Sequence, residues 1–191
     1  YFGGETRSPA YRAVNVMGEV PVLEHRGRTL TQSGVILDYL AGTLGRFGAR
    51  DDDERREILR WLLWDNHKLT SYTATFRFMR SLAKDADPGA MAEFGRRARA
   101  AWSVLDAHLA GRRYVVGDRL TIADLSICGY LFFDGGPYNP SSELHERFGG
   151  IVDDSLIEQV VDEMVDEVGD QRDILQLALG IDEHDGSGVI D

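Results

Sequence analysis

The chain has 191 residues, of which 43% are hydrophobic and 28% charged, and its formal net charge is −11. This apolar content suffices for one medium domain or two small ones, and the absence of any run of about 18 apolar residues excludes a transmembrane helix. The single cysteine, Cys128, excludes an internal disulfide framework and a cysteine-based zinc site. We therefore expect a cytoplasmic protein with no metal site and no membrane partner.

The negative charge is concentrated at one end of the chain. Residues 151–191 hold thirteen of the 32 Asp and Glu residues, and Arg172 is their only basic residue. The preceding 150 residues carry a net charge of +1. A neutral body with an acidic tail offers no basic surface to a phosphate backbone, so we expect no nucleic-acid partner.

The first part of the chain has the turn and capping residues of a small α/β unit. Turn residues, β-branched runs and apolar spacing predict its elements in order. These are a helix at 8–14 capped by Ser8, strands at 20–24 and 29–30 joined at 26–27, and a helix that begins at Ser33 and ends at Gly42 and Gly45.

The next part is helical. Residues 46–53 form a polar linker whose three aspartates favour the start of a helix. Apolar residues then recur at spacings of three and four, which predicts three helices. They cover about residues 54–83, residues 91–109, and a segment from Thr121 to about Phe133.

Four polar residues of these helices bear on the distinction between structural and functional roles. Asp65 lies on the apolar stripe, either at its edge with a salt bridge or water, or facing a cleft or a partner subunit. Thr121 and Asp124 have the spacing of a capping box, a structural role. Cys128, on an apolar helix, is interpreted as an inert core residue rather than a nucleophile.

Val20 and Pro21 stand at the start of a predicted strand. Pro21 is either an ordinary edge proline or the second residue of a cis peptide bond. A cis bond would turn backbone N–H and C=O groups outward, where they could pair with a peptide-like ligand as an added strand.

Gln32 and Ser33 stand where a strand passes into a helix. The partial positive charge of a helix N-terminus suits a carboxylate, the Ser33 hydroxyl can add a donor, and the Gln32 carbonyl can hold an amine. The alternative is that Ser33 is a plain N-cap.

Together these residues resemble the glutathione-binding half of the cytosolic glutathione S-transferases. The first motif is Asn15-x-x-Gly18-x-Val20-Pro21-Val22-Leu23-Glu24, followed by Leu30-Thr31-Gln32-Ser33-x-x-Ile36-x-x-Tyr39-Leu40. Residues 114–126 resemble the signature of the family's helical domain, and residues 2–7 with 64–68 resemble a bacterial branch. The resemblance covers roughly residues 1–133.

The resemblance implies a fold and a ligand. Residues 1–45 would form a partial thioredoxin-like glutathione-binding domain, and residues 46–134 a helical-bundle C-terminal domain, giving an α/β plus all-α protein. Pro21 would be the cis proline, the Val20 backbone would pair with the cysteinyl part of glutathione, and Gln32 and Ser33 would hold the γ-glutamyl amine and carboxylate. A homodimer is also implied.

The sequence departs from the family pattern at both ends. The pattern places the catalytic residue in a unit that precedes Tyr1, so the expectation is an N-terminally truncated chain without its catalytic residue. Residues 135–191 form an acidic, partly helical tail of uncertain origin. Within it, residues 183–191 resemble the first nine positions of an EF-hand calcium loop, or else form a flexible acidic end.

Two hypotheses of function follow. The first is a glutathione S-transferase-like protein that, when intact, adds the glutathione thiol to a small electrophile. The second is a non-catalytic interaction module of the same fold whose acidic tail docks on a basic partner.

Overall fold

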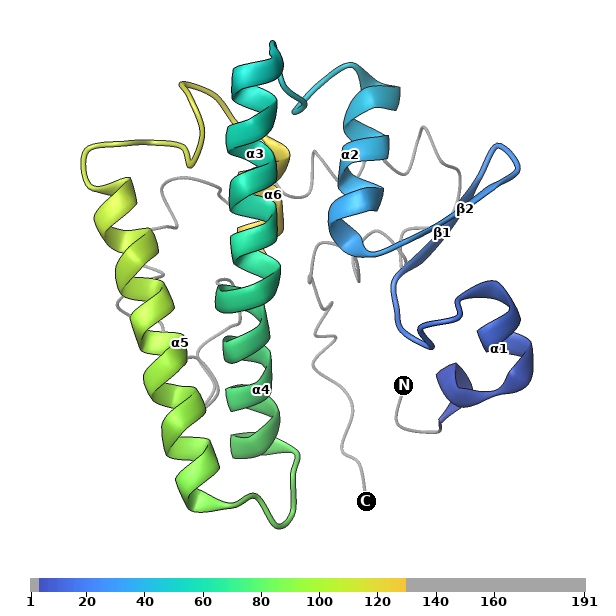
Figure 1. Cartoon of the computed structure of the whole chain (residues 1–191), viewed down its shortest axis with the longest axis vertical. Coiled ribbons are helices and arrows are strands. Elements are labelled where there is room, and N and C mark those ends of the chain that lie inside the picture. Colours follow the sequence, from blue (N-terminus) through green and yellow to red (C-terminus); the bar gives the residue numbers. More distant parts are fainter. Residues whose placement is uncertain (1–3, 130–191) are drawn as a thin grey trace, which may run out of the picture.

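The computed structural model describes residues 4–129 (Figure 1). The expectations for the acidic tail and the calcium loop lie outside these residues. The elements, in order, are η1 (Glu5–Arg7), α1 (Pro9–Val14), β1 (Val22–His25), β2 (Arg28–Thr31), α2 (Ser33–Leu44), α3 (Asp52–Trp64), the π-helical turn η2 (Asp65–Leu69), α4 (Thr70–Ser81), α5 (Pro88–Leu109) and α6 (Ile122–Cys128). In Figure 1, α3 and α4 form one long column with α5 beside it, while α1, the hairpin and α2 lie on its other side.

The predicted short helix and hairpin are confirmed. The Ser8 hydroxyl caps α1 by accepting a hydrogen bond from the Tyr11 N–H at 3.1 Å. Strands β1 and β2 pair antiparallel, with Val22 opposite Thr31. Arg26 and Gly27 both have positive φ (50° and 72°), the conformation that suits a two-residue hairpin turn.

Helix α2 begins at Ser33, as predicted, and ends at Gly45, which has φ 66° and donates its N–H to the Ala41 carbonyl. The prediction that Gly42 also ends this helix is wrong. Gly42 lies inside α2, on its exposed side. The neighbouring Leu40 and Ala41 are buried, and their burial outweighs the cost of about 1 kcal/mol of one glycine in a helix.

The predicted long helix over residues 54–83 is interrupted. Asp51 caps its first part by accepting from the Glu54 N–H at 2.8 Å. The regular α-helix stops at Trp64, and the π-helical turn η2 follows before α4 continues. A π turn accommodates one extra residue, so it rotates the side chains of α4 about the helix axis relative to those of α3.

The two remaining helices begin with strong caps. The Asp87 carboxylate accepts from the Ala90 N–H, and Pro88 stands at the first position of α5. Helix α6 starts with the predicted capping box of Thr121 and Asp124. The end of the helix predicted to about Phe133 lies outside the described residues.

The buried apolar side chains form one cluster that joins the hairpin and α2 to the helices. It includes Leu23, Ile36, Leu37 and Leu40 together with Ile58, Trp61, Leu105, Ile122 and Leu125. Helices α2 and α3 both pack against α6, and the Ile122 N–H donates to the Phe47 carbonyl at 3.0 Å. The predicted division at residue 45 stays a prediction.

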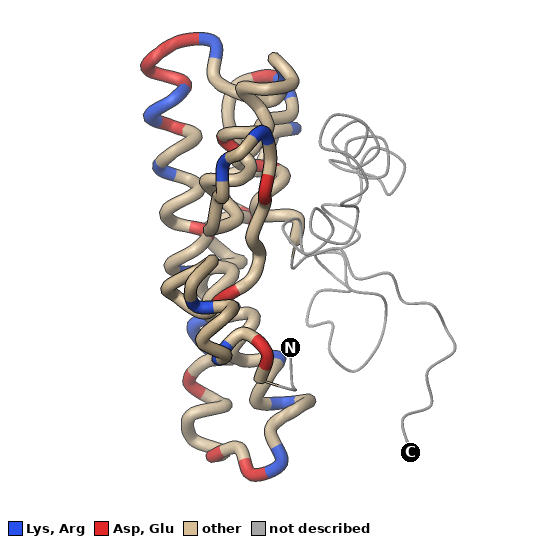
Figure 2. Tube along the Cα trace, turned by 90° about the vertical axis from the view of Figure 1, so that its right-hand side faces the viewer, with Lys and Arg blue, Asp and Glu red and all other residues tan. Residues whose placement is uncertain are grey.

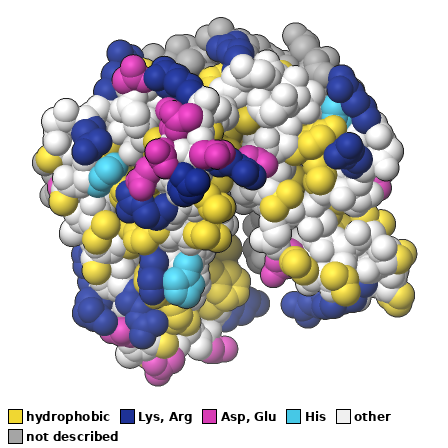
Figure 3. All heavy atoms as spheres, turned by 45° about the horizontal axis from the view of Figure 1, so that its top comes forward, with side chains coloured by type: hydrophobic (Ala, Val, Ile, Leu, Met, Phe, Trp, Pro, Cys, Tyr) yellow, Lys and Arg dark blue, Asp and Glu magenta, His cyan; other side chains and the backbone are white. Residues whose placement is uncertain are grey.

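Charged residues are mixed over the surface. Lys and Arg alternate with Asp and Glu along the described trace (Figure 2). Acidic and basic side chains also lie beside one another over the upper part of the face in Figure 3. On α5, for example, the Glu93 carboxylate accepts from both Arg96 and Arg97.

The capping box predicts a large effect of one substitution. The Asp124 side chain is 2% exposed and accepts from the Val115 and Thr121 N–H groups at 2.7 and 2.9 Å. Asp124→Ala leaves both buried donors unpaired, and we expect it to lower the free energy of unfolding by about 3 kcal/mol, measured by urea titration with circular dichroism. Asp118→Ala, which removes an exposed partner of Arg50, serves as the control and should change little. Equal losses in the two variants would contradict this role of Asp124.

Candidate functional site

Buried Asn15 organises the segment that leads into β1. Its side chain is 3% exposed. The Asn15 Oδ1 accepts from the Met17 N–H at 3.1 Å, and its Nδ2 donates to the Glu19 carbonyl at 2.7 Å. The Tyr11 hydroxyl donates to the same carbonyl at 2.8 Å. The backbone just before Val20 is therefore fixed from two sides.

Gly18 is required within this segment for two reasons. Its φ is 67°, a conformation that L side chains rarely adopt. A Cβ at this position would lie 2.9 Å from the Thr6 carbonyl oxygen and 3.1 Å from the Arg12 guanidinium. The turn between Asn15 and Glu19 therefore depends on glycine.

The Val20–Pro21 peptide bond is cis, so of the two alternatives the ordinary edge proline is wrong. Both residues precede β1, which begins at Val22. The Val20 side chain is 38% exposed.

Gln32 occupies the N-cap position of α2, and Ser33 is the first helical residue. The alternative of Ser33 as a plain N-cap is therefore wrong. Gln32 has φ 70° and ψ 119°, an uncommon conformation for a residue with a Cβ. The backbone carbonyl of Gln32 accepts hydrogen bonds from the Val35 and Ile36 N–H groups. Ser33 is half-buried at the helix start. Backbone outliers of this kind cluster at ligand sites.

The Gln32 side chain connects the two candidate segments. Its Nε2 donates to the Met17 sulfur at 3.0 Å and to the Glu19 Oε2 at 3.2 Å. The structure thus brings the start of α2 next to the segment that contains Val20. Sequence analysis missed Asn15, Met17 and Glu19 as parts of this arrangement, although Asn15 and Gly18 belong to the motif on which the resemblance rests.

Asp65 has neither of its expected roles. It is 1% exposed, so it does not face a cleft or a partner, and its carboxylate accepts from the hydroxyls of Thr70 (2.8 Å) and Ser126 (2.6 Å). The π turn places it inside, between η2 and α6. Burial raises the pKa of Asp65 above its ordinary value, and the two hydroxyl donors offset part of this rise.

Cys128 is suited to the inert role that was predicted. Burial, together with the nearby carboxylates of Asp124 and Asp65, raises the pKa of its thiol far above the ordinary value. The thiol is therefore protonated at neutral pH and is a poor nucleophile.

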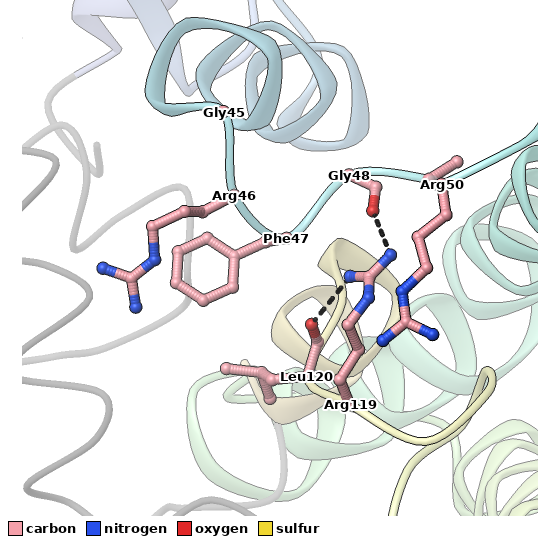
Figure 4. A pocket seen from close by; sticks show the side chains of 8 residues that line it. Gly45, Arg46, Phe47, Gly48, Arg50, Arg119 and Leu120 are labelled. Carbon is pink, nitrogen blue, oxygen red and sulfur yellow. Dashed lines mark hydrogen bonds between the residues drawn. The ribbon is translucent and has the colours of Figure 1, made fainter.

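A separate cavity of about 480 Å³ lies between the linker after α2 and the loop before α6 (Figure 4). The Arg119 guanidinium donates to the Gly48 and Leu120 carbonyls and to the Glu54 carboxylate. Because Gly45 and Ser33 mark opposite ends of α2, this cavity is distinct from the Gln32 region. No hydrophobic pattern or motif of the sequence indicates it.

Within residues 4–129, no group of three or more His, Cys, Asp or Glu side chains is placed to hold a metal ion. None of the helices in this part of the chain is both long and apolar enough to span a membrane.

Comparison with known proteins supports one family. The model of the glutathione S-transferase N-terminal domain matches residues 2–42. A glutathione S-transferase, GST-4.5, from Xanthomonas campestris pv. campestris is 35% identical over 131 residues, which cover 66% of this chain and 62% of that relative. The disulfide-bond oxidoreductase YghU of Escherichia coli is 30% identical over 128 residues, covering 65% of this chain and 44% of YghU. The chain thus matches less than two thirds of either relative's length.

Solved structures agree with this result. A possible glutathione S-transferase from Rhodopseudomonas palustris is 29% identical, with a TM-score of 0.64 over 85% of this chain and 71% of its own. The architecture is that of a thioredoxin-like domain followed by helices, as predicted. These matches support the glutathione S-transferase family for this chain, with bacterial proteins among its relatives.

Asn15 provides a prediction for the site. Asn15→Ala removes two hydrogen bonds of a buried side chain, and we expect a loss of about 1–3 kcal/mol in the free energy of unfolding, measured by urea titration. Asn66→Ala is the matched control, because Asn66 is exposed and its Nδ2 donates to the Leu62 carbonyl four residues earlier. If both variants unfold at the same urea concentration, Asn15 does not anchor this segment.

Asp65 provides a prediction of pH dependence. Because its pKa is raised in the folded state, the folded protein binds this proton more tightly than the unfolded chain, and the residue lowers stability as pH rises from about 4. We expect Asp65→Asn to be stabilising relative to the wild type at pH 7, with the advantage shrinking as pH falls to 5. Thermal unfolding at both pH values measures this difference.

The control for this experiment is Asp38→Asn, which removes the same charge from the exposed side of α2. An advantage of Asp65→Asn that is constant with pH, or that grows at low pH, would contradict the raised pKa.

Proposed function

We propose that this protein binds glutathione where the Glu19–Val20 segment meets the start of α2. In the complete protein, the bound thiol would be added to a small electrophile. The observation that supports this most directly is the Gln32 side chain, whose amide reaches from the helix start to Glu19 and so joins the two segments in one site.

Each part of this arrangement has a chemistry that suits a part of glutathione. The N-terminal turn of α2 has unpaired N–H groups and a partial positive charge, which favour the γ-glutamyl carboxylate, and the Ser33 hydroxyl can donate to it. The side-chain carbonyl of Gln32 can accept a hydrogen bond from the ammonium group of the γ-glutamyl residue. The Val20 backbone would pair with the extended cysteinyl segment in the manner of an added strand.

The family supplies the reaction class. The Xanthomonas relative carries the name glutathione S-transferase, and we propose the same transferase activity here, in a cytoplasmic homodimer. The fixed position of the bound peptide would hold its thiol in place for attack on the electrophile. The hypothesis of an interaction module depends on residues 135–191, which lie outside the described part of the chain.

Calorimetric titration with glutathione tests the binding site. We expect Ser33→Ala to weaken binding about 5- to 10-fold, because it removes a hydrogen-bond donor to a charged carboxylate. Ser103→Ala is the matched control, since the exposed Ser103 hydroxyl donates within α5 to the Arg99 carbonyl. A wild-type chain that takes up no glutathione, or equal affinities of the two variants, would refute the site.

A conjugation assay with a chloronitrobenzene separates binding from catalysis. Turnover by the full-length protein supports the transferase reaction. Glutathione binding without turnover would retain the site but contradict the proposed activity toward this electrophile class.

A further inference from the structure

The cavity between the linker after α2 and the loop before α6 has a chemistry that the glutathione site does not use. Its volume of about 480 Å³ is within the range that holds a small organic ligand. Among the described residues, the charged side chains that line it are those of Arg46, Arg50 and Arg119. Phe47, Leu120 and small residues form the rest of the wall (Figure 4). The cavity thus combines cationic groups with an apolar surface.

Hydrogen bonds between the linker and the loop hold the cavity walls in place. The Ile122 N–H donates to the Phe47 carbonyl at 3.0 Å, and the Arg119 Nη2 donates to the Gly48 carbonyl at 2.6 Å. The Arg119 Nη1 also donates to the Leu120 carbonyl at 3.4 Å. Because both segments are already ordered by these contacts, a ligand would not have to order them on binding.

Arg46 and Phe47 form one wall of the cavity. Phe47 is 8% exposed and has φ 66°, an uncommon conformation for a residue with a Cβ. The Arg46 guanidinium lies 4.8 Å from the centroid of the Phe47 ring, and Figure 4 shows the two side chains beside each other. This cation–π contact places a positive charge next to the apolar part of the wall.

The carboxylates near the cavity already have protein partners. Glu54 Oε2 accepts from the Arg119 Nη2 at 2.7 Å and from the Arg50 backbone N–H, and the Asp51 carboxylate caps α3. Asp118 contacts the Arg50 guanidinium at 2.9 Å, but the two side chains are 76% and 56% exposed. An ion pair this exposed is weak, so Arg50 can exchange Asp118 for an anion in the cavity.

We propose that this cavity binds a small phosphate monoester. The phosphate group would contact Arg50 and Arg119, because guanidinium groups match phosphate oxygens in geometry and two of them suit a doubly charged anion. The organic group would lie against Phe47 and Leu120, which favours an ester over free phosphate. The cavity and the proposed glutathione site lie at opposite ends of α2, so both ligands can be bound at once.

Calorimetry with phenyl phosphate and inorganic phosphate tests this site on the full chain. We expect the wild type to bind phenyl phosphate more tightly than inorganic phosphate, because the ring adds apolar contact. Arg50→Gln should weaken the binding of phenyl phosphate roughly 3- to 10-fold, the effect of one partly exposed charged donor. Arg60→Gln is the matched control and should bind as the wild type does, since Arg60 is 57% exposed and pairs with Glu57 on α3.

Each contrary result of this titration has a distinct meaning. A wild type that takes up neither compound at millimolar concentration, or equal losses in Arg50→Gln and Arg60→Gln, would overturn the site. Equal affinities of the wild type for the two compounds would overturn the preference for an ester and leave free phosphate as the ligand. Circular dichroism and unfolding midpoints verify that both variants fold.

Chemical modification of the wild type provides a measurement that needs no variant. Phenylglyoxal modifies exposed arginines, and peptide mass spectrometry locates the products. We expect phenyl phosphate to protect Arg50 and to leave the modification of Arg60 unchanged, with or without saturating glutathione. Loss of this protection when glutathione is added would contradict a separate site. Because the protection does not require glutathione to bind, a failure of the proposed glutathione site would not affect this result.

Discussion

The buried side-chain amide of Asn15 is the constraint on which the candidate site depends. The segment between Asn15 and β1 belongs to no helix or strand, and this side chain holds it together with the Tyr11 hydroxyl and the positive φ of Gly18. The Gly18 N–H also donates to the Asn15 carbonyl, and the Arg12 guanidinium donates to the Val16 carbonyl. Because the Glu19 carbonyl is fixed in this way, the following residues enter the strand from a defined direction. The backbone that we propose to pair with glutathione is therefore prepared before a ligand arrives.

Local chemistry explains why much of the fold could be predicted from the sequence. The caps by Ser8, Asp51 and the pair Thr121–Asp124 each depend on residues no more than three positions apart. The hairpin turn depends on two adjacent residues. Such features are visible in one short stretch of sequence, and the structure confirms each of them.

What the sequence could not predict depends on longer distances or on a single inserted residue. The spacing places Asp65 on the apolar stripe, but its contact with Ser126, 61 residues away, and the π turn in which it stands cannot be inferred from periodicity. The same holds for Gln32, whose side-chain partners Met17 and Glu19 lie 15 and 13 residues earlier. Its residue type indicated a site, but the orientation of its amide required the structure.

The position of the helix start also links the site to the helical part of the protein. Gly34, next to Ser33, faces Asn66 of η2, and a Cβ on Gly34 would lie 3.8 Å from the Asn66 Nδ2. One turn further on, Ile36 and Leu37 are buried in the common core. Helix α2 packs against α6 and β2, so its first turn is positioned by the same core that holds α6. The geometry around Gln32 is therefore determined jointly by the Asn15 segment and by the packing of α2 on α6, because neither one alone fixes both sides of the Gln32–Glu19 contact.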